Sequence, residues 1–292
     1  MVLTFTVAYI AIHIPPVQQF IARKAVDKVE ENMDGTINFD KLYLALFNRV
    51  AIENFSIVGL QNDTLVSAQK LSIHLSLKDL FLKGEMTAKR VNIRNGIFNF
   101  IEEDSNKRSN LDRIFRTPLV KDTTKGEWPS INIKELRIQD YRFNFQAFLK
   151  RPQFGAPGCM NYDDIGVSEI NLRISDIQTR PKKGVTAIIH SLSAKEKGGL
   201  DLKNLSAEFS LDKDATTFTN LTLQENYSEV KAKKLIFSYD SGKDLKYYVQ
   251  KIKMDADFVN TYLNFNTIGL FSPNMQNNNL SLYLNGRVYG PV

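Results

Sequence analysis

The sequence predicts a mainly β protein, and three observations lead to this prediction. After Gly35, apolar and polar residues alternate in many short stretches, as in "LSIHLSL" at 71–77. Turn residues such as Gly, Asn and Lys separate these stretches, and only one helix candidate, around Asn110 to Phe115, interrupts them. Alternation with period two gives each strand one apolar and one polar face. Such strands favour antiparallel pairing, because parallel sheets are usually buried on both faces.

The chain begins with an apolar run, "MVLTFTVAYIAIHI". A helix of this length covers roughly 20 Å, which is less than the hydrocarbon core of a bilayer at about 30 Å. No Lys or Arg precedes the run, and "IPPV" at 14–17 does not resemble a cleavage site made of small residues. Three interpretations stay open at this point: the outer part of an anchor whose start is missing, a buried helix or strand, and a poor signal peptide.

Residues 15–34 are expected to form an amphipathic helix. Pro15 and Pro16 suit a first helical turn, since the N–H that proline lacks would be unbonded there. Apolar residues such as Val17 and Phe20 then recur at helical spacing against charged residues on the other side. Gly35 suits the left-handed residue that follows a helix. A helix that covers a core and a helix that lies on a bilayer both fit this pattern.

The strand pattern continues through 141–145, 170–174, 205–211 and 280–284. Apolar positions change parity near Gly96 and between Ile133 and Leu136, and bulges or tight turns would account for both changes. Strands with one apolar face cover roughly 250 residues, near the upper end for one all-β domain. A closed sandwich or barrel and an extended, curved sheet with an open groove remain alternatives, because the inward apolar face looks the same in both.

Composition and motifs argue against several classes of function. The chain of 292 residues carries a net charge of +6, but its basic residues are spread singly, which argues against nucleic-acid binding and is consistent with a nearby anionic membrane. The single cysteine, Cys159, excludes an intramolecular disulfide. His13, His74 and His190 lack the spacing of metal ligands. We therefore expect no enzymatic activity, no metal site and no cofactor.

Several stretches, in order along the chain, resemble the N-terminal part of the TamB and AsmA-like family, the translocation and assembly module proteins, as found in Bacteroidota-like bacteria. "IPPVQQFIARKAVDKVEENM" is similar to the segment that joins the family's anchor to its first helix. The family's strand repeats resemble "VAIENFSIVGLQNDTLVSAQKLSIHLSLKDLF", "KRVNIRNGIFNF" with "SNLDRIF", "INIKELRIQDYRFNF" and "IHSLSAKEKGGLDLKNLSAEFSLD". "LSLYLNGRVYGPV" resembles the close of such a repeat.

The resemblance implies an architecture as well as a location. Residues 36–292 would form a long, curved, antiparallel sheet with an open apolar groove (β-taco-like) that continues beyond the C-terminus of this sequence. The amphipathic helix at 15–34 and a truncated membrane anchor at 1–14 would precede it. The chain would then be a single-pass inner-membrane protein of a Gram-negative bacterium, with its body in the periplasm. The expected anchor residues are Val2, Leu3, Phe5, Val7, Ala8, Tyr9, Ile10 and Ile12.

The resemblance also implies a function in lipid transport. The groove would conduct phospholipid acyl chains between the inner and outer membranes. One alternative is a scaffold for outer-membrane protein assembly or secretion, with a BamA/TamA-like partner bound through the missing C-terminal region. Another, outside the family, is a compact β-sandwich binding module. Candidate residues lining the groove are Leu71, Ile73, Leu75, Leu77, Leu205, Ala207, Phe209, Leu211, Leu280, Leu282 and Leu284.

Overall fold

The computed structural model describes residues 15–45, 48–76, 87–104, 108–116, 131–148, 158–180, 184–240, 251–276 and 280–291. Residues 1–14 lie outside these ranges, and so does Leu77. The expected anchor residues Val2, Leu3, Phe5, Val7, Ala8, Tyr9, Ile10 and Ile12 therefore stay a prediction. Within the described ranges, no helix combines the length and the apolar character that crossing a membrane requires.

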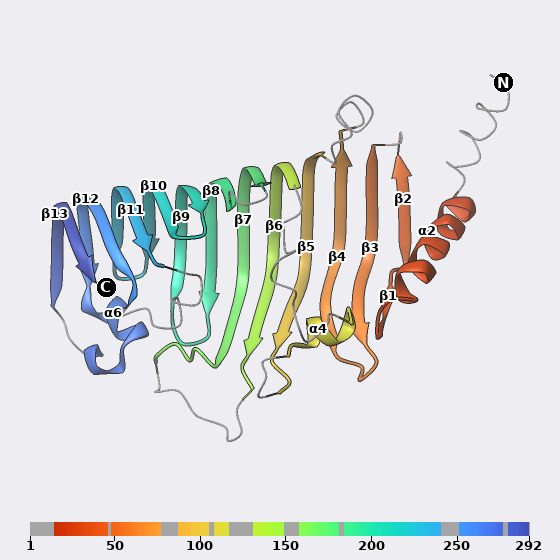
Figure 1. The fold of residues 1–292 in the computed structure, drawn as a ribbon, viewed down its shortest axis with the longest axis horizontal. Coiled ribbons are helices and arrows are strands. Elements are labelled where there is room, and N and C mark those ends of the chain that lie inside the picture. The colour runs from red at the N-terminus through yellow and green to blue at the C-terminus, as the bar shows by residue number, and fades with distance from the viewer. Residues whose placement is uncertain are drawn as a thin grey trace. The chain divides into compact units, whose positions relative to one another are not determined.

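The described part of the chain is mainly β, as the sequence predicts (Figure 1). Its elements are α2 (Pro15–Glu30), β1 (Gly35–Asn38), β2 (Lys41–Ala45), β3 (Arg49–Gly59), β4 (Thr64–Leu75), β5 (Thr87–Ile101), α4 (Asn110–Ile114), β6 (Ile131–Gln146), β7 (Asp164–Arg180), β8 (Gly184–Glu196), β9 (Asp201–Leu211), β10 (Ala215–Glu225), β11 (Glu229–Ser238), β12 (Lys253–Asn264), α6 (Phe265–Phe271), the 3₁₀ helix η2 (Pro273–Met275) and β13 (Ser281–Pro291).

The strands form one open, mostly antiparallel sheet of 13 strands. Its order is β1-β3-β4-β5-β6-β7-β8-β9-β10-β11-β12-β13, with β2 also paired to β3. Because this order has two ends, the sheet is not closed, and a closed sandwich or barrel is excluded for the described residues.

Contacts divide the chain into two compact units. Unit 1 comprises Met1–Asp122, Ile138–Gln153 and Asp163–Gly166, and unit 2 comprises Thr123–Arg137, Phe154–Tyr162 and Val167–Val292.

The core of unit 1 lies where the short helix α4 meets the sheet. Met33, Leu65 and Ile114 are fully or almost fully buried there, with Ile37, Ile57, Phe98 and Leu111 packed against them. A capping box starts α4: the Ser109 hydroxyl accepts a hydrogen bond from the Asp112 N–H at 3.1 Å, and the Asp112 carboxylate accepts one from the Ser109 N–H at 3.2 Å. The helix expected around Asn110 to Phe115 is thus confirmed.

A cation fixes α4 to the strand ends around it. The Arg113 guanidinium lies 2.8 Å from the Asp63 carboxylate and 2.9 Å from that of Glu103, and all three side chains are largely buried. Asp63 follows β3, and Glu103 follows β5. The pairing therefore fixes α4 against both strand ends.

Helix α2 covers the edge strands β1 and β2 (Figure 1). The Glu30 carboxylate accepts a hydrogen bond from the backbone N–H of Ile37 at 2.5 Å, and the Arg23 guanidinium lies 4.4 Å from the ring centre of the buried Phe39. Edge strands expose unpaired N–H groups that invite pairing with other chains, and Glu30 occupies one of them. Two apolar residues of the predicted amphipathic helix, Phe20 and Val29, are exposed in the structure. The amphipathic arrangement predicted for 15–34 stays a prediction.

Seven strand residues adopt left-handed backbone conformations, with φ between 47° and 53°. They share one sequence motif. An apolar residue lies two positions before the left-handed residue, and the alternation of the strand resumes after it, as in "IENFSI" at 52–57 and "FTNLTL" at 218–223. Phe218 and Leu221 would face opposite sides of a regular strand, yet both pack in one cluster. Each such residue therefore acts as a bulge that keeps the apolar side chains on one face. The seven are Asn54, Asn95, Asp140, Glu169, Asp176, Asn220 and Asn260.

The left-handed position at Asn260 predicts a contrast between two substitutions. Asn260→Gly should leave the free energy of unfolding nearly unchanged, because glycine adopts φ of 47° without strain. Asn260→Val should lower it by about 1–2 kcal/mol, because a β-branched side chain is disfavoured there. Urea denaturation measures both. As a control, Asn204→Val on β9, where φ is negative, should not destabilise the protein. Equal effects of valine at both positions would contradict the strain argument.

Tyr141 covers the glycine at the parity change in β5. A Cβ on Gly96 would lie 2.0 Å from the Ser67 carbonyl oxygen and 2.6 Å from the Tyr141 ring, so only glycine fits. The Tyr141 hydroxyl donates a hydrogen bond to the Ile97 carbonyl oxygen at 3.1 Å. Burial raises the pKa of the Tyr141 phenol from 10.0 to about 12.

This shift predicts a loss of stability at high pH. Because the pKa in the folded state exceeds that in the unfolded state, the folded protein favours the protonated phenol. The stabilisation is complete below pH 10 and is lost as pH rises from about 10 to about 12. Denaturation midpoints measured across this range should fall more steeply for the natural protein than for Tyr141→Phe. Parallel profiles would show that Tyr141 does not carry the effect.

One helix contradicts the expectation that a single helix candidate follows Gly35. Helix α6 (Phe265–Phe271, "FNTIGLF") begins where the Asn264 side chain accepts a hydrogen bond from the Asn266 N–H at 2.8 Å. Its aromatic, β-branched and glycine residues are poor helix formers, so its stability comes from tertiary contacts. The Thr267 hydroxyl donates to the buried Glu225, and the Gly269 carbonyl oxygen accepts from the Cys159 thiol at 3.0 Å.

Candidate functional site

The candidate site is the apolar face of unit 2. Register places Leu205, Leu223 and Val230 directly opposite one another on β9, β10 and β11. A second, longer row crosses β8 to β13, each residue directly opposite the next: Ala187, Phe209, Phe218, Leu235, Ala256 and Val288. At about 4.8 Å between neighbouring strands, this row spans roughly 24 Å. We refer to it as the apolar row.

The side chains around the apolar row pack on their neighbours within the sheet. Ala207, Leu221, Ala232, Ala256 and Phe258 form a buried cluster whose partly buried contacts all come from β9 to β13. The Phe209 and Phe218 rings lie 5.4 Å apart. Among the described elements, helix α6 contacts β12 and η2. Many of the apolar side chains on this face are half-buried.

Charged and hydroxyl side chains occupy the opposite face of unit 2, which we call the polar face. Asp255 and Arg287 pair across β12 and β13 at 2.7 Å, and this arginine holds the pKa of the Asp255 carboxyl below its usual value. On β9 and β10, Glu208 and Thr219 lie directly opposite each other. The two faces of the same strands thus differ sharply in chemistry.

The structure brings together most of the predicted lining residues of unit 2. Ala207 belongs to the buried cluster and Leu205 packs against it. Phe209 packs against Phe218 with its ring tilted, and Leu211 lies opposite Val185 and Thr216 on the same face. On β13, Leu284 packs against the cluster and Leu282 lies opposite Leu263. Leu280 differs: it precedes β13 and is 60 % exposed.

The other predicted lining residues belong to unit 1. On β4, Leu71 lies opposite Ile52 and Ile93, and Ile73 lies opposite Val50 and Val91. Leu75 ends the strand after a register shift. Leu77 lies outside the described residues.

The same apolar face of unit 1 includes an aromatic stretch. Phe98 and Phe100 lie beside Phe143 and Phe145, with ring centres 6.0 Å apart in both pairs.

The titratable residues do not converge on a reaction centre in the described part of the chain. The His190 ring nitrogen lies 2.8 Å from the Ser175 hydroxyl. His74 lies on β4 directly opposite Arg49 and Arg90 on the neighbouring strands, and burial, followed by these two charges, lowers its pKa. No group of three His, Cys, Asp or Glu side chains in the described ranges could hold a metal ion.

Alternation within single strands did not reveal the apolar row, because the row runs across strands. Two of the seven left-handed residues, Asn220 and Asn260, lie on strands of the row, and their recurring motif was readable in the sequence. Without that motif, strict alternation assigns Phe218 and Leu221 to opposite faces. Ala187 and Ala256 were also missed, because alanine alone is a weak strand signal.

No model of a known protein family matches the chain, and no curated protein matches it.

Proposed function

We propose that this chain binds phospholipid acyl chains on the apolar row and conducts them between the inner and outer membranes of a Gram-negative cell, as a TamB and AsmA-like protein anchored to the inner membrane. The body would lie in the periplasm. Binding would need no enzymatic chemistry, metal or cofactor. The resemblance to the family suggests the compartment, and the apolar row supports the ligand.

The observation that carries the proposal is the unbroken apolar row across β8 to β13. Apolar surface removed from water contributes about 25 cal/mol per Å², so an acyl chain lying on the half-buried Phe209, Phe218 and Leu235 would be stabilised there. No polar side chain interrupts the row. A bound chain would therefore cross it without meeting an unpaired polar group.

Site-specific photocrosslinking in cells tests this proposal. Leu223 and Thr222 are neighbours on β10 and face opposite sides of the sheet. A photoreactive residue at Leu223 should capture phospholipid, and one at Thr222 should capture little. Capture from Thr222 alone, or from neither position in a folded protein, would refute lipid binding on this face.

The edge strand β13 favours a second candidate function, a scaffold for outer-membrane protein assembly with a BamA/TamA-like partner. β13 pairs with β12 and ends the sheet order, so its other edge is unpaired within the described residues. An unpaired edge can add a strand from another chain. Photoreactive residues on β13 should then capture barrel proteins, while Leu223 should capture no lipid.

A further inference from the structure

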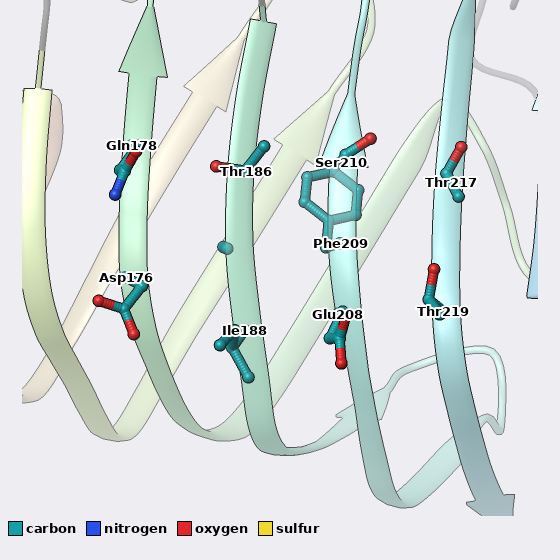
Figure 2. Close-up of a pocket in the computed structure, with 10 residues that line it drawn as sticks. Asp176, Gln178, Thr186, Ile188, Glu208, Phe209, Ser210, Thr217 and Thr219 are labelled. Atoms are coloured by element: carbon teal, nitrogen blue, oxygen red, sulfur yellow. The ribbon is translucent and has the colours of Figure 1, made fainter.

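The polar face of unit 2 contains a depression of about 350 Å³, formed by β7 to β10 (Figure 2). Its residues form two rows across the strands. One consists of Gln178, Thr186, Ser210 and Thr217, each directly opposite the next. The other consists of Ile188, Glu208 and Thr219, with Asp176 beside them on β7. Phe209 and Ala187 also border the depression, but by alternation their side chains belong to the apolar row.

Four hydroxyl groups in this depression have no hydrogen-bonding partner among the described residues. They belong to Thr186, Ser210, Thr217 and Thr219. Each hydroxyl can donate one hydrogen bond and accept two. Since neighbouring strands lie about 4.8 Å apart, the four form a regular array of donors and acceptors open to a ligand.

The charges in the depression restrict the ligand. Among the described residues that line it, Asp176 and Glu208 are the charged ones. The Asn220 amide donates to the Glu208 carboxylate at 3.3 Å, and the Lys134 ammonium donates to that of Asp176 at 3.4 Å. Lys134 partly balances the charge of Asp176, but no cation is among the described lining residues, so the two carboxylates disfavour phosphate and sulfate groups. They accept hydrogen bonds strongly from hydroxyl groups. Ile188, 38 % exposed, adds an apolar surface between them.

We propose that this depression binds a neutral, polyhydroxylated ligand, namely a short segment of a glycan. Vicinal sugar hydroxyls match an array of hydroxyl, amide and carboxylate groups, and the C–H face of a sugar ring matches Ile188. The volume lies near the lower end of the range for small-ligand pockets, roughly 300 to 1,000 Å³. This site lies on the opposite face from the apolar row, so its function does not depend on lipid binding.

Titration of the full chain with defined saccharides tests the proposal. The neutral probes are maltotriose and N-acetylated chitotriose, and the anionic probe is a sulfated heparin disaccharide. At least one neutral probe should bind, and the sulfated one should not. Replacing Thr217 and Thr219 together by valine should weaken binding by about tenfold, as expected for the loss of two hydrogen bonds. Glu208→Gln, which keeps the shape but removes the charge, should weaken it by about fivefold.

Thr222→Val is the matched control, because Thr222 lies on the same strand and face but outside the depression. It should leave affinity unchanged, and circular dichroism should show all variants folded. Three results would overturn the proposal: no binding of either neutral probe, tighter binding of the sulfated probe, or equal weakening by Thr222→Val. Saturable binding of calcium ions without any saccharide binding would also overturn it, in favour of a cation site.

Discussion

Replacing Ile114 by alanine is expected to lower the free energy of unfolding of unit 1 by about 3 kcal/mol, within the range of about 2–5 kcal/mol for such truncations in a core. The Ile114 side chain is 0 % exposed and packs with Met33 and Leu65. Alanine removes three carbon atoms and leaves a cavity that the surrounding backbone cannot fill, because the Arg113 ion pairs hold α4 in place. Denaturation followed by far-ultraviolet circular dichroism measures the effect.

Phe115 provides the control for this prediction. It is the next residue along the chain and is larger than Ile114, but it is exposed. Phe115→Ala should change the free energy of unfolding by less than about 0.5 kcal/mol, as is usual for surface positions. Similar losses for both variants would mean that α4 contributes through its backbone rather than through the buried Ile114 side chain.

Placing a carboxylate in the apolar row is expected to reduce lipid capture by at least tenfold. Leu235 lies directly opposite Phe218 and Ala256 in the middle of the row. A carboxylate covered by an acyl chain loses its hydration without gaining a partner, which costs several kcal/mol. Photocrosslinking yield from a probe at Phe218 should therefore fall in Leu235→Glu, since the two side chains are direct cross-strand neighbours.

Two further variants separate this effect from a loss of folding. Leu235→Met conserves volume and polarity and should capture lipid normally. Thr222→Glu adds the same charge on the polar face and should also capture lipid normally. If Leu235→Glu retains its cooperative unfolding transition and still captures lipid from Phe218 at the natural yield, the apolar row is not the path of the acyl chain.

The strands were predictable from the sequence because alternation is a local property. The odd-numbered residues from Leu205 to Leu211 share one face on β9, as their spacing predicted, and the short helix α4 lies where the sequence indicated a helix. Leu280 shows the limit of this reasoning. It continues the alternation of Leu282 and Leu284, yet it precedes β13 and is exposed, because α6 and η2 intervene before the strand begins.

What the sequence could not predict depends on contacts between distant segments. Helix α6 has poor helix formers, and its contacts to Glu225 and Cys159 come from elsewhere in the chain. The depression on the polar face combines side chains from four strands, and each of these strands alone is an ordinary solvated surface. An open sheet and a closed one likewise have the same alternation, and only the pairing of the end strands distinguishes them.

The left-handed residues within the strands have a consequence for how this chain can change in length. Removing Asn220 from "FTNLTL" leaves a regular alternation of apolar and threonine residues, with every apolar side chain still on its original face. Loss of one residue elsewhere in the strand would instead move every side chain beyond that point to the opposite face of the sheet. Single-codon deletions among descendants of this gene should therefore concentrate at these seven positions, where a strand can lose a residue while its apolar side chains stay on the same face.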